Sequence, residues 1–201
     1  MRKAFLLITL ITILLVPAFA QDDDGNGELF VPVYSLGDQT LRINLGTFFP
    51  LFFFGGPDGP APANLTLGGA GSLVWESYLS STITIGVEVG GSFSFTPNFR
   101  TLFMLPIAVR GSYIFNLYPF EIPVTLAAGM NFSRLSDIQK IDPFVKAGGS
   151  FLWNYSSQWA FGGNLFYWFV PQIYLATSPA GADATRYGNF LEFTLSALYH
   201  F

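Results

Sequence analysis

The chain has 201 residues, of which 51% are hydrophobic and 18% aromatic, while only 11% are charged. Its 13 acidic and 9 basic residues leave a formal net charge of -4 at pH 7, which argues against nucleic acid as a partner because nucleic-acid-binding domains carry a basic surface. No cysteine is present, so disulfides and an anchor through a lipid-modified N-terminal cysteine are both excluded.

The first 20 residues have the three parts of a secretory signal peptide. A basic start, MRK, is followed by the apolar stretch AFLLITLITILLV and by PAFA, in which Ala18 and Ala20 form the small-x-small pattern that signal peptidases accept. We expect cleavage after Ala20, so that the mature chain begins at Gln21. Residues 21–39 are then expected to form an acidic N-terminal segment in the periplasm. Three forms remain open for it: a disordered tail, a plug, or an extension of the first strand.

From residue 40 onward, apolar and polar residues alternate in short segments, as they do in β-strands with one apolar face. No segment there has the roughly 18 consecutive apolar residues of a transmembrane helix. Eight segments show the alternation, and they span 41–49, 66–78, 82–95, 101–115, 122–133, 143–155, 159–170 and 190–201. Because open strand edges cannot lie in lipid, this pattern predicts an all-β fold, an eight-stranded antiparallel up-and-down transmembrane β-barrel over residues 40–201.

The connections between these segments alternate in length. Those after the odd-numbered segments are generally longer, the longest being FFFGGPDGPAPANL and TSPAGADATRYGN, whereas LSS, NLYPFE and SSQ follow the even-numbered ones. Transmembrane barrels have short periplasmic turns and longer outer loops, so both mature termini are expected in the periplasm. Aromatic residues near the periplasmic strand ends predict an interfacial belt. They are Trp75, Tyr78, Tyr113, Tyr118, Trp153, Tyr155, Trp159 and Tyr199.

Six charged residues fall on the inward face of the predicted strands. They are Arg42, Glu76, Glu88, Arg110, Lys146 and Glu192. A charge that faced lipid near the midplane would be unfavourable by about 2–4 kcal/mol, whereas an inward charge can find a partner. Three acids and three bases suggest pairing, with Glu88 near Arg110, and we interpret the six as an ion-paired filling of a narrow lumen. The alternative is a solvated passage, which the many inward glycines, such as Gly86 and Gly129, favour.

An enzymatic site has little support in this sequence. The single histidine, His200, lies next to the end of the last predicted strand and is interpreted as an inward polar side chain at the base of the barrel. No metal-ligand spacing and no phosphate-binding loop is present. We therefore expect no catalysis, no cofactor and no bound metal.

The last predicted strand leads to a resemblance. Phe193, Leu195 and Tyr199 alternate with polar residues up to a terminal Phe201. This pattern resembles the signal that the outer-membrane barrel assembly machinery of diderm bacteria reads. With its signal peptide and eight strands, the mature chain is similar throughout to the small outer-membrane barrels of the OmpX, OmpW and OmpA-transmembrane type. The resemblance implies a location in the cell outer membrane and, as partners, membrane lipids, the assembly machinery and periplasmic chaperones.

The expected function follows from the predicted barrel and its charged interior. We expect an integral outer-membrane protein with a structural and surface-interaction role and a largely plugged lumen. Two alternatives remain: a narrow, porin-like pore for small solutes, and a surface adhesin that acts through the outer loops. The sequence identifies neither a solute nor an extracellular ligand.

Overall fold

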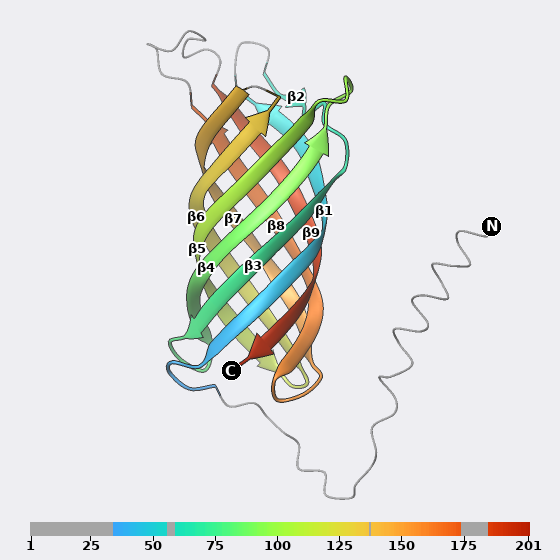
Figure 1. Ribbon diagram of the computed structural model, residues 1–201. Coiled ribbons are helices and arrows are strands. Elements are labelled where there is room, and N and C mark those ends of the chain that lie inside the picture. The colour runs from blue at the N-terminus through green and yellow to red at the C-terminus, as the bar shows by residue number, and fades with distance from the viewer. Residues whose placement is uncertain (1–33, 56–58, 137, 174–184) are drawn as a thin grey trace, which may run out of the picture. The chain divides into compact units, whose positions relative to one another are not determined.

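The computed structural model describes residues 34–55, 59–136, 138–173 and 185–201 (Figure 1). The predicted signal peptide, residues 1–20, and residues 21–33 of the predicted N-terminal segment lie outside these ranges. In the described part of the chain, no helix has the length and apolar character needed to cross a membrane.

The described residues form nine strands. They are β1 (Gln39–Phe54), β2 (Ala61–Pro62), β3 (Gly68–Tyr78), β4 (Ile83–Phe95), β5 (Thr101–Leu117), β6 (Phe120–Leu135), β7 (Ile138–Asn154), β8 (Trp159–Gln172) and β9 (Arg186–His200). All eight predicted segments are strands. The additional strand, β2, is two residues long and pairs with β1 near Phe52 and Phe53.

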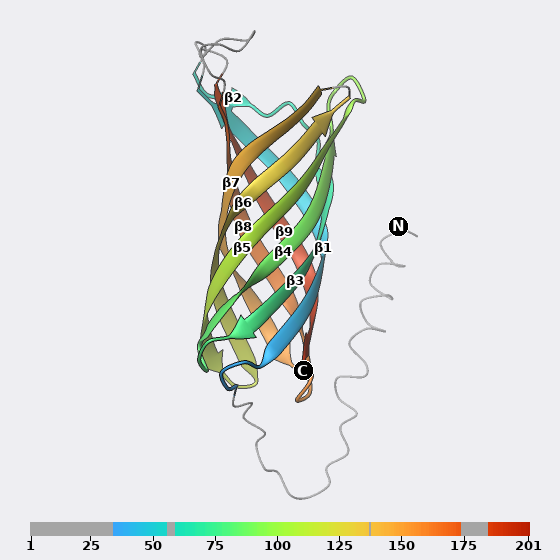
Figure 2. The ribbon, with the colours of Figure 1, turned by 60° about the vertical axis from the view of Figure 1, so that its left-hand side comes forward.

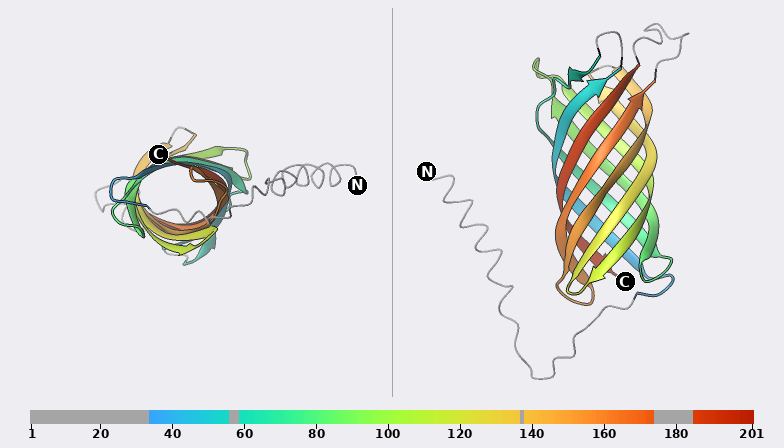
Figure 3. Two further views of the ribbon diagram at one scale, coloured as in Figure 1. Left: turned by 90° about the horizontal axis from the view of Figure 1, so that it is seen from below. Right: turned by 180° about the vertical axis from the view of Figure 1, so that it is seen from behind.

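The eight long strands close into an antiparallel barrel, which confirms the predicted fold class. Each strand pairs with the next along the chain, and β9 pairs with β1 to complete the ring seen in the left view of Figure 3. One circuit through the paired residues starts at Gln39 and returns to β1 at Phe49, ten residues further on. Such a stagger requires the strands to tilt against the barrel axis, as Figure 2 shows.

The two ends of the barrel differ in their connections. We call the end at which β1 begins and β9 finishes the terminal end, and the opposite end the loop end. At the terminal end, residues 79–82, 118–119 and 155–158 join neighbouring strands. At the loop end, residues 55–67 and 173–185 are the longest connections.

The alternation along each strand separates an apolar exterior from a lumen with many polar side chains. On β4, for example, Ile85 and Val87 are exposed, whereas Thr84 and Glu88 are buried. The long strands have 11 to 17 residues, which exceeds or matches the roughly 9–11 residues that a tilted strand needs to cross a bilayer. The exposed surface of the barrel therefore has the chemistry of a surface in contact with lipid.

Several strands extend beyond the predicted bounds. β7 begins at Ile138, so the predicted loop RLSDIQKID shrinks to the two residues 136 and 137. β1 likewise continues to Phe54 rather than ending at Phe49. The cause is pairing: in a closed sheet a partner strand is always present, and Leu135 opposite Ile138 continues the ladder to the turn. Hydrophobic alternation weakens near these turns, so the sequence pattern alone predicts strands that are too short.

Two prolines interrupt the ladders without changing the register. Between β4 and β5, the paired residues skip from Val89–Ile107 to Ser92–Met104, and Pro106 lies in the gap. Pro123 lies in a similar gap between β6 and β7. Proline has no amide N–H to donate, so a ladder loses its local hydrogen bonds where a proline faces it.

The inward glycines do not leave space for a solute. A Cβ atom at Gly86 would overlap the carbonyl oxygen of Trp75, and one at Gly129 would overlap that of Ile107. The backbone of the neighbouring strand occupies this volume, so these glycines permit close strand approach and the sharp curvature of a narrow barrel. Their number is therefore no argument for a passage.

Candidate functional site

The lumen is the candidate site, and it is filled in three layers. The base cluster lies at the terminal end and consists of Tyr34, Tyr78, Ile114, Glu121 and His200. The ion-pair chain lies in the middle and consists of the six predicted charged residues. The aromatic layer lies toward the loop end and consists of Phe48, Phe144, Phe166, Trp168 and Phe190.

The ion-pair chain runs through side chains from six strands with alternating charge. Its nitrogen–oxygen distances are 3.2 Å for Arg42–Glu76, 3.3 Å for Glu76–Arg110, 3.0 Å for Arg110–Glu88, 2.6 Å for Glu88–Lys146 and 3.0 Å for Lys146–Glu192. Each of these side chains is at most 4% exposed. Three cations and three anions leave this buried chain with no net charge.

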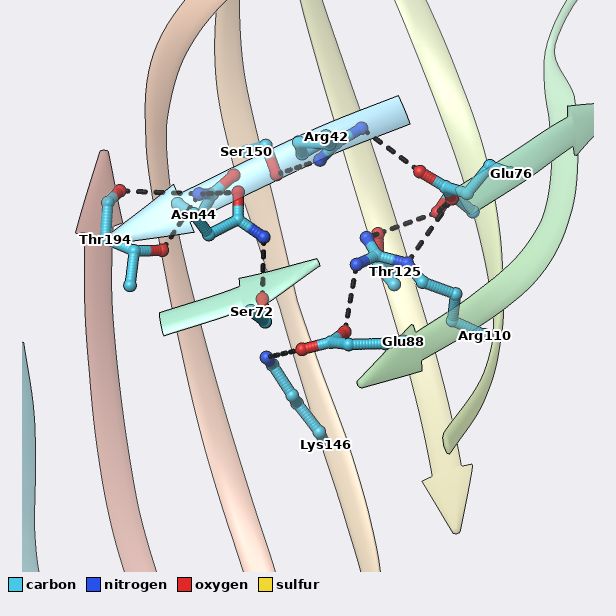
Figure 4. A network of polar contacts seen from close by, with 12 residues as sticks. Arg42, Asn44, Ser72, Glu76, Glu88, Arg110, Thr125, Lys146, Ser150 and Thr194 are labelled. Carbon is cyan, nitrogen blue, oxygen red and sulfur yellow. Dashed lines mark hydrogen bonds and ion pairs between the residues drawn. The ribbon is translucent and has the colours of Figure 1, made fainter. Parts of the chain in front are cut away.

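Figure 4 shows the Glu76 carboxylate between Arg42 and Arg110, and hydroxyl groups complete its surroundings. Thr84 and Ser112 donate to its Oε1 atom at 3.0 and 2.9 Å, while Oε2 accepts from Arg42. Arg110 in turn donates to the Thr125 hydroxyl at 3.2 Å. These contacts matter because removing charged groups from water is expensive, and ion pairs compensate for it only when the remaining hydrogen-bonding capacity is also satisfied.

A second polar cluster lies on the wall formed by β1, β3, β8 and β9. Asn44 donates to the Ser72 hydroxyl at 2.8 Å, and Asn164 donates to the Thr194 hydroxyl at 2.9 Å. Asn164 also donates to the Asn44 side-chain oxygen at 3.2 Å, which joins the two pairs along this wall.

The aromatic layer includes two large apolar side chains from β8. Phe166 and Trp168 lie on the inward face of β8 and are both 2% exposed, so the strand keeps its alternation. Trp168 packs against Phe48 and Phe144, each with a ring-centroid distance of 5.3 Å. The Lys146 ammonium lies 4.5 Å from the centroid of Phe166 and 5.0 Å from that of Trp168, within the range of cation–π attraction. The aromatic layer therefore rests directly on the ion-pair chain.

The base cluster closes the opposite side of the lumen. Tyr34, which precedes β1, stacks on Tyr78 with a centroid distance of 4.4 Å and on His200 at 4.8 Å. Its hydroxyl donates to Glu121 at 2.8 Å, and Asn154 donates to the same carboxylate oxygen at 2.8 Å. Burial and the nearby Glu121 carboxylate raise the pKa of Tyr34, which keeps the phenol protonated as a donor.

Sequence reasoning placed one member of the base cluster, His200, and missed the other four, which are Tyr34, Tyr78, Ile114 and Glu121. Tyr78 was expected in the interfacial belt, but it is 2% exposed and points inward. The signal was present, because Tyr78 lies two residues after Glu76 and so shares its face of β3. Tyr34 lies in the segment whose form was left open, and its side chain is 9% exposed and stacks on Tyr78 and His200. Five of the predicted belt residues do lie on the exposed surface: Trp75, Tyr113, Tyr118, Tyr155 and Trp159.

Within the described ranges, no group of three His, Asp or Glu side chains is arranged to hold a metal ion. His200, interpreted from sequence as an inward side chain at the barrel base, lies there at 9% exposure. Its Nε2 atom is 3.3 Å from the Tyr34 hydroxyl. Because the single O–H of Tyr34 donates its hydrogen bond to Glu121, the hydroxyl oxygen is left as the acceptor and His200 Nε2 as the donor in this contact.

The residues of the predicted assembly signal lie on the outer face of β9 or directly after it. Phe193, Leu195 and Phe201 are exposed, and Tyr199 is partly exposed and contacts the Trp159 ring at a centroid distance of 4.9 Å. Phe201 N–H donates to the Gln39 carbonyl, so the end of the chain is tied to the start of β1. Their recognition by the assembly machinery remains a prediction.

The closed eight-stranded barrel, its apolar exterior and its buried ion-pair chain define a small outer-membrane β-barrel protein. The fold is similar to that of Neisserial surface protein A, with a TM-score of 0.61, 7% identity, and coverage of 81% of this chain and 97% of that one. It is also similar to the outer membrane protein OprG from Pseudomonas aeruginosa, with a TM-score of 0.53, 10% identity, and coverage of 85% and 99%. A specific likeness to the OmpW type is not established.

Sequence comparison places the chain in a family. A protein-family model matches residues 21–199, and the chain belongs to the family that this model describes. An uncharacterized protein of Borreliella burgdorferi is 26% identical over 155 residues, which cover 66% of this chain and 73% of that protein. An uncharacterized protein of Treponema pallidum is 25% identical over 175 residues, which cover 82% and 78%. These matches indicate no enzyme family.

Proposed function

We propose that this protein is an integral component of the bacterial outer membrane with a structural and surface-interaction role, and that it does not conduct solutes. The observation that carries the proposal is the filled lumen. Ion pairs, amide contacts and stacked aromatic rings occupy it from the base cluster to the aromatic layer. A narrow pore would need a continuous hydrated path, and the inward glycines do not provide one.

Planar-bilayer recording tests the absence of conduction. Refolded protein that begins at Gln21 should give no current steps above those of a protein-free bilayer. A matched variant, Trp168→Ala with Phe166→Ala, removes two rings of the aromatic layer and reports whether that layer is a seal. Steady ohmic steps from the unaltered protein would overturn the proposal and favour the pore alternative.

The proposed location and processing rest on the signal-like N-terminus and on the extent of the family match. The match begins at residue 21, directly after the expected cleavage site. Mass spectrometry of fractionated membranes should find a mature terminus at Gln21 in the outer membrane. An intact Met1 terminus in the inner membrane would contradict it. Membrane lipids, periplasmic chaperones and the barrel assembly machinery are the partners that follow from this location.

The proposed orientation places the loop end outside the cell. Support comes from the longer connections there and from Phe99, which lies at a tight turn between β4 and β5 with 90% exposure. A solvent-exposed aromatic side chain at a loop tip suits contact with another surface.

The absence of cysteine makes the orientation directly testable. A Phe99→Cys variant should react with a membrane-impermeant maleimide on intact cells, whereas Ser80→Cys, in the turn between β3 and β4, should react only after the outer membrane is opened. The reverse labelling pattern would refute the orientation.

A further inference from the structure

The residues just before β1 form a turn that directs one side chain into the barrel. The Ser35 amide donates to the Asp38 carboxylate at 2.8 Å, and the Asp38 amide donates to the Ser35 carbonyl at 3.2 Å. Gly37 has a φ of 97°, which side chains with a Cβ rarely adopt. The turn therefore places its two large side chains differently: Leu36 is 76% exposed, whereas Tyr34 lies inside the terminal end and is 9% exposed.

The site that Tyr34 occupies has the features of a binding site for a phenol. We call this site the seat, and it is formed by Tyr78, Glu121, Asn154 and His200. The Tyr34 ring stacks on Tyr78 and on His200, with interplanar angles of 21° and 12°, and the Tyr78 and His200 ring centroids are themselves 6.5 Å apart. The Glu121 carboxylate, on a residue that is 3% exposed, accepts a hydrogen bond from the Tyr34 hydroxyl. Asn154 holds the same carboxylate by a second hydrogen bond. Two rings available for stacking and one buried hydrogen-bond acceptor together select an aromatic ring that carries a hydroxyl group.

The seat separates the ion-pair chain from the terminal end. Between the seat and the ion-pair chain is a cavity of about 10 Å³, lined among others by Thr40, Arg42, Glu76 and Tyr78. This volume accommodates about one water molecule. Arg42 and Glu76, which line this cavity, attract each other more strongly the lower the local dielectric is.

We propose that Tyr34 is an intramolecular stopper: its phenol occupies a built seat formed by β3, β6, β7 and β9, seals the terminal end, and keeps bulk water from the Arg42 end of the ion-pair chain. The seat is a phenol-binding site in its own right, normally filled by the chain itself. The inference goes beyond the proposed function because it assigns a ligand class to one end of the lumen, whichever way the barrel faces.

A single reporter cysteine tests the seal. Thr40→Cys places a thiol in the cavity above the seat, in a chain without other cysteines. In the folded protein in micelles, a small cationic methanethiosulfonate should modify this thiol at least tenfold faster when Tyr34→Ala is added. Leu36→Ala, an exposed position in the same turn, is the matched control and should leave the rate unchanged. Equal rates for Tyr34→Ala and the reporter alone would overturn the proposal.

Two further measurements separate a lost stopper from general loosening. Ser92→Cys reports on the lumen near the loop end and should stay slow in the Tyr34→Ala background; a parallel rise there would overturn the proposal. Asp38→Ala removes the turn contact but keeps the phenol, and it should also raise the rate at which the Thr40→Cys thiol is modified. An unchanged rate would count against the turn as the element that positions Tyr34. This second variant keeps the test available if Tyr34→Ala does not fold.

Rescue by a soluble phenol tests the seat itself. Added p-cresol should slow the modification of Thr40→Cys in the Tyr34→Ala background toward the rate with Tyr34 present. Toluene has the same ring and methyl group without the hydroxyl and should protect less, because it offers Glu121 no proton. If p-cresol gives no protection, or protects no better than toluene, the phenol seat is refuted.

Discussion

Replacing Glu88 by glutamine should destabilise the barrel strongly, because Glu88 joins the two halves of the ion-pair chain. Its carboxylate lies 3.0 Å from Arg110 and 2.6 Å from Lys146, and all three side chains are at most 4% exposed. Glu88→Gln leaves three cations facing two anions in the lumen. Removing one partner of a buried pair typically costs about 3–5 kcal/mol, and we expect a loss of unfolding free energy in this range.

The pairing pattern predicts which second substitution restores stability. With Glu88→Gln and Arg110→Gln together, Arg42–Glu76 and Lys146–Glu192 remain as two complete pairs. With Glu88→Gln and Lys146→Met, the net charge is again balanced, but Glu192 loses its partner and Arg110 shares Glu76 with Arg42. We therefore expect the first double variant to recover at least half of the loss and the second to recover less.

Urea unfolding in micelles, followed by tryptophan fluorescence, measures these differences, since Trp168 packs beside the Lys146 ammonium. The reasoning fails if both double variants lose the sum of their single losses. It also fails if Glu88→Gln changes stability by less than about 1 kcal/mol, the size expected of an exposed, screened pair. The second result would indicate a hydrated lumen.

Two further predictions concern packing and assembly. Gly129→Ala should prevent or strongly weaken folding, because its Cβ would overlap the Ile107 carbonyl oxygen. Gly111→Ala should be tolerated, since the nearest atom to its Cβ is 3.8 Å away. Heat-modifiable gel migration of both variants measures folding, and equal migration of the two would contradict the prediction. Deletion of Phe201 should lower the amount of assembled barrel without changing the transcript level. The same gel shift measures the folded protein, and a quantitative transcript measurement is the control. Wild-type abundance of folded protein would argue against an assembly signal.

The fold could be predicted because the barrel's exterior follows a strict rule. On each strand every second residue faces lipid and is mostly apolar, so parity alone assigned Glu88 and Arg110 to the lumen. Their proximity also follows from a short hairpin, since Glu88 pairs with Ala108, two residues from Arg110. Strand bounds were less predictable because backbone pairing continues where alternation fades, as it does between Leu135 and Ile138.

The interior was harder to predict because its packing depends on neighbours from distant strands. Parity could place Phe166 and Trp168 inside, but only the barrel stagger shows that they meet Phe48 and Phe144 in one layer. The role of the inward glycines depends on how closely the next strand approaches. Tyr34 lies outside the alternating segments, and its insertion depends on a turn and on four partners scattered through the chain.

The placement of charge also bears on how the barrel selects one register. A one-residue slip between neighbouring strands would turn charged side chains toward lipid and is excluded by the apolar exterior. A two-residue slip is different, because it preserves parity and leaves the exterior equally apolar. In the lumen, however, a two-residue slip between β4 and β5 breaks one ion pair in either direction. A slip that places Glu88 opposite Pro106 moves Arg110 away from Glu88, and a slip that places Glu88 opposite Arg110 moves Arg110 away from Glu76. The shift is about 7 Å in each case, since each residue of a strand rises about 3.3 Å. The lumen, and not the lipid-facing surface, therefore distinguishes the native register from its nearest competitor.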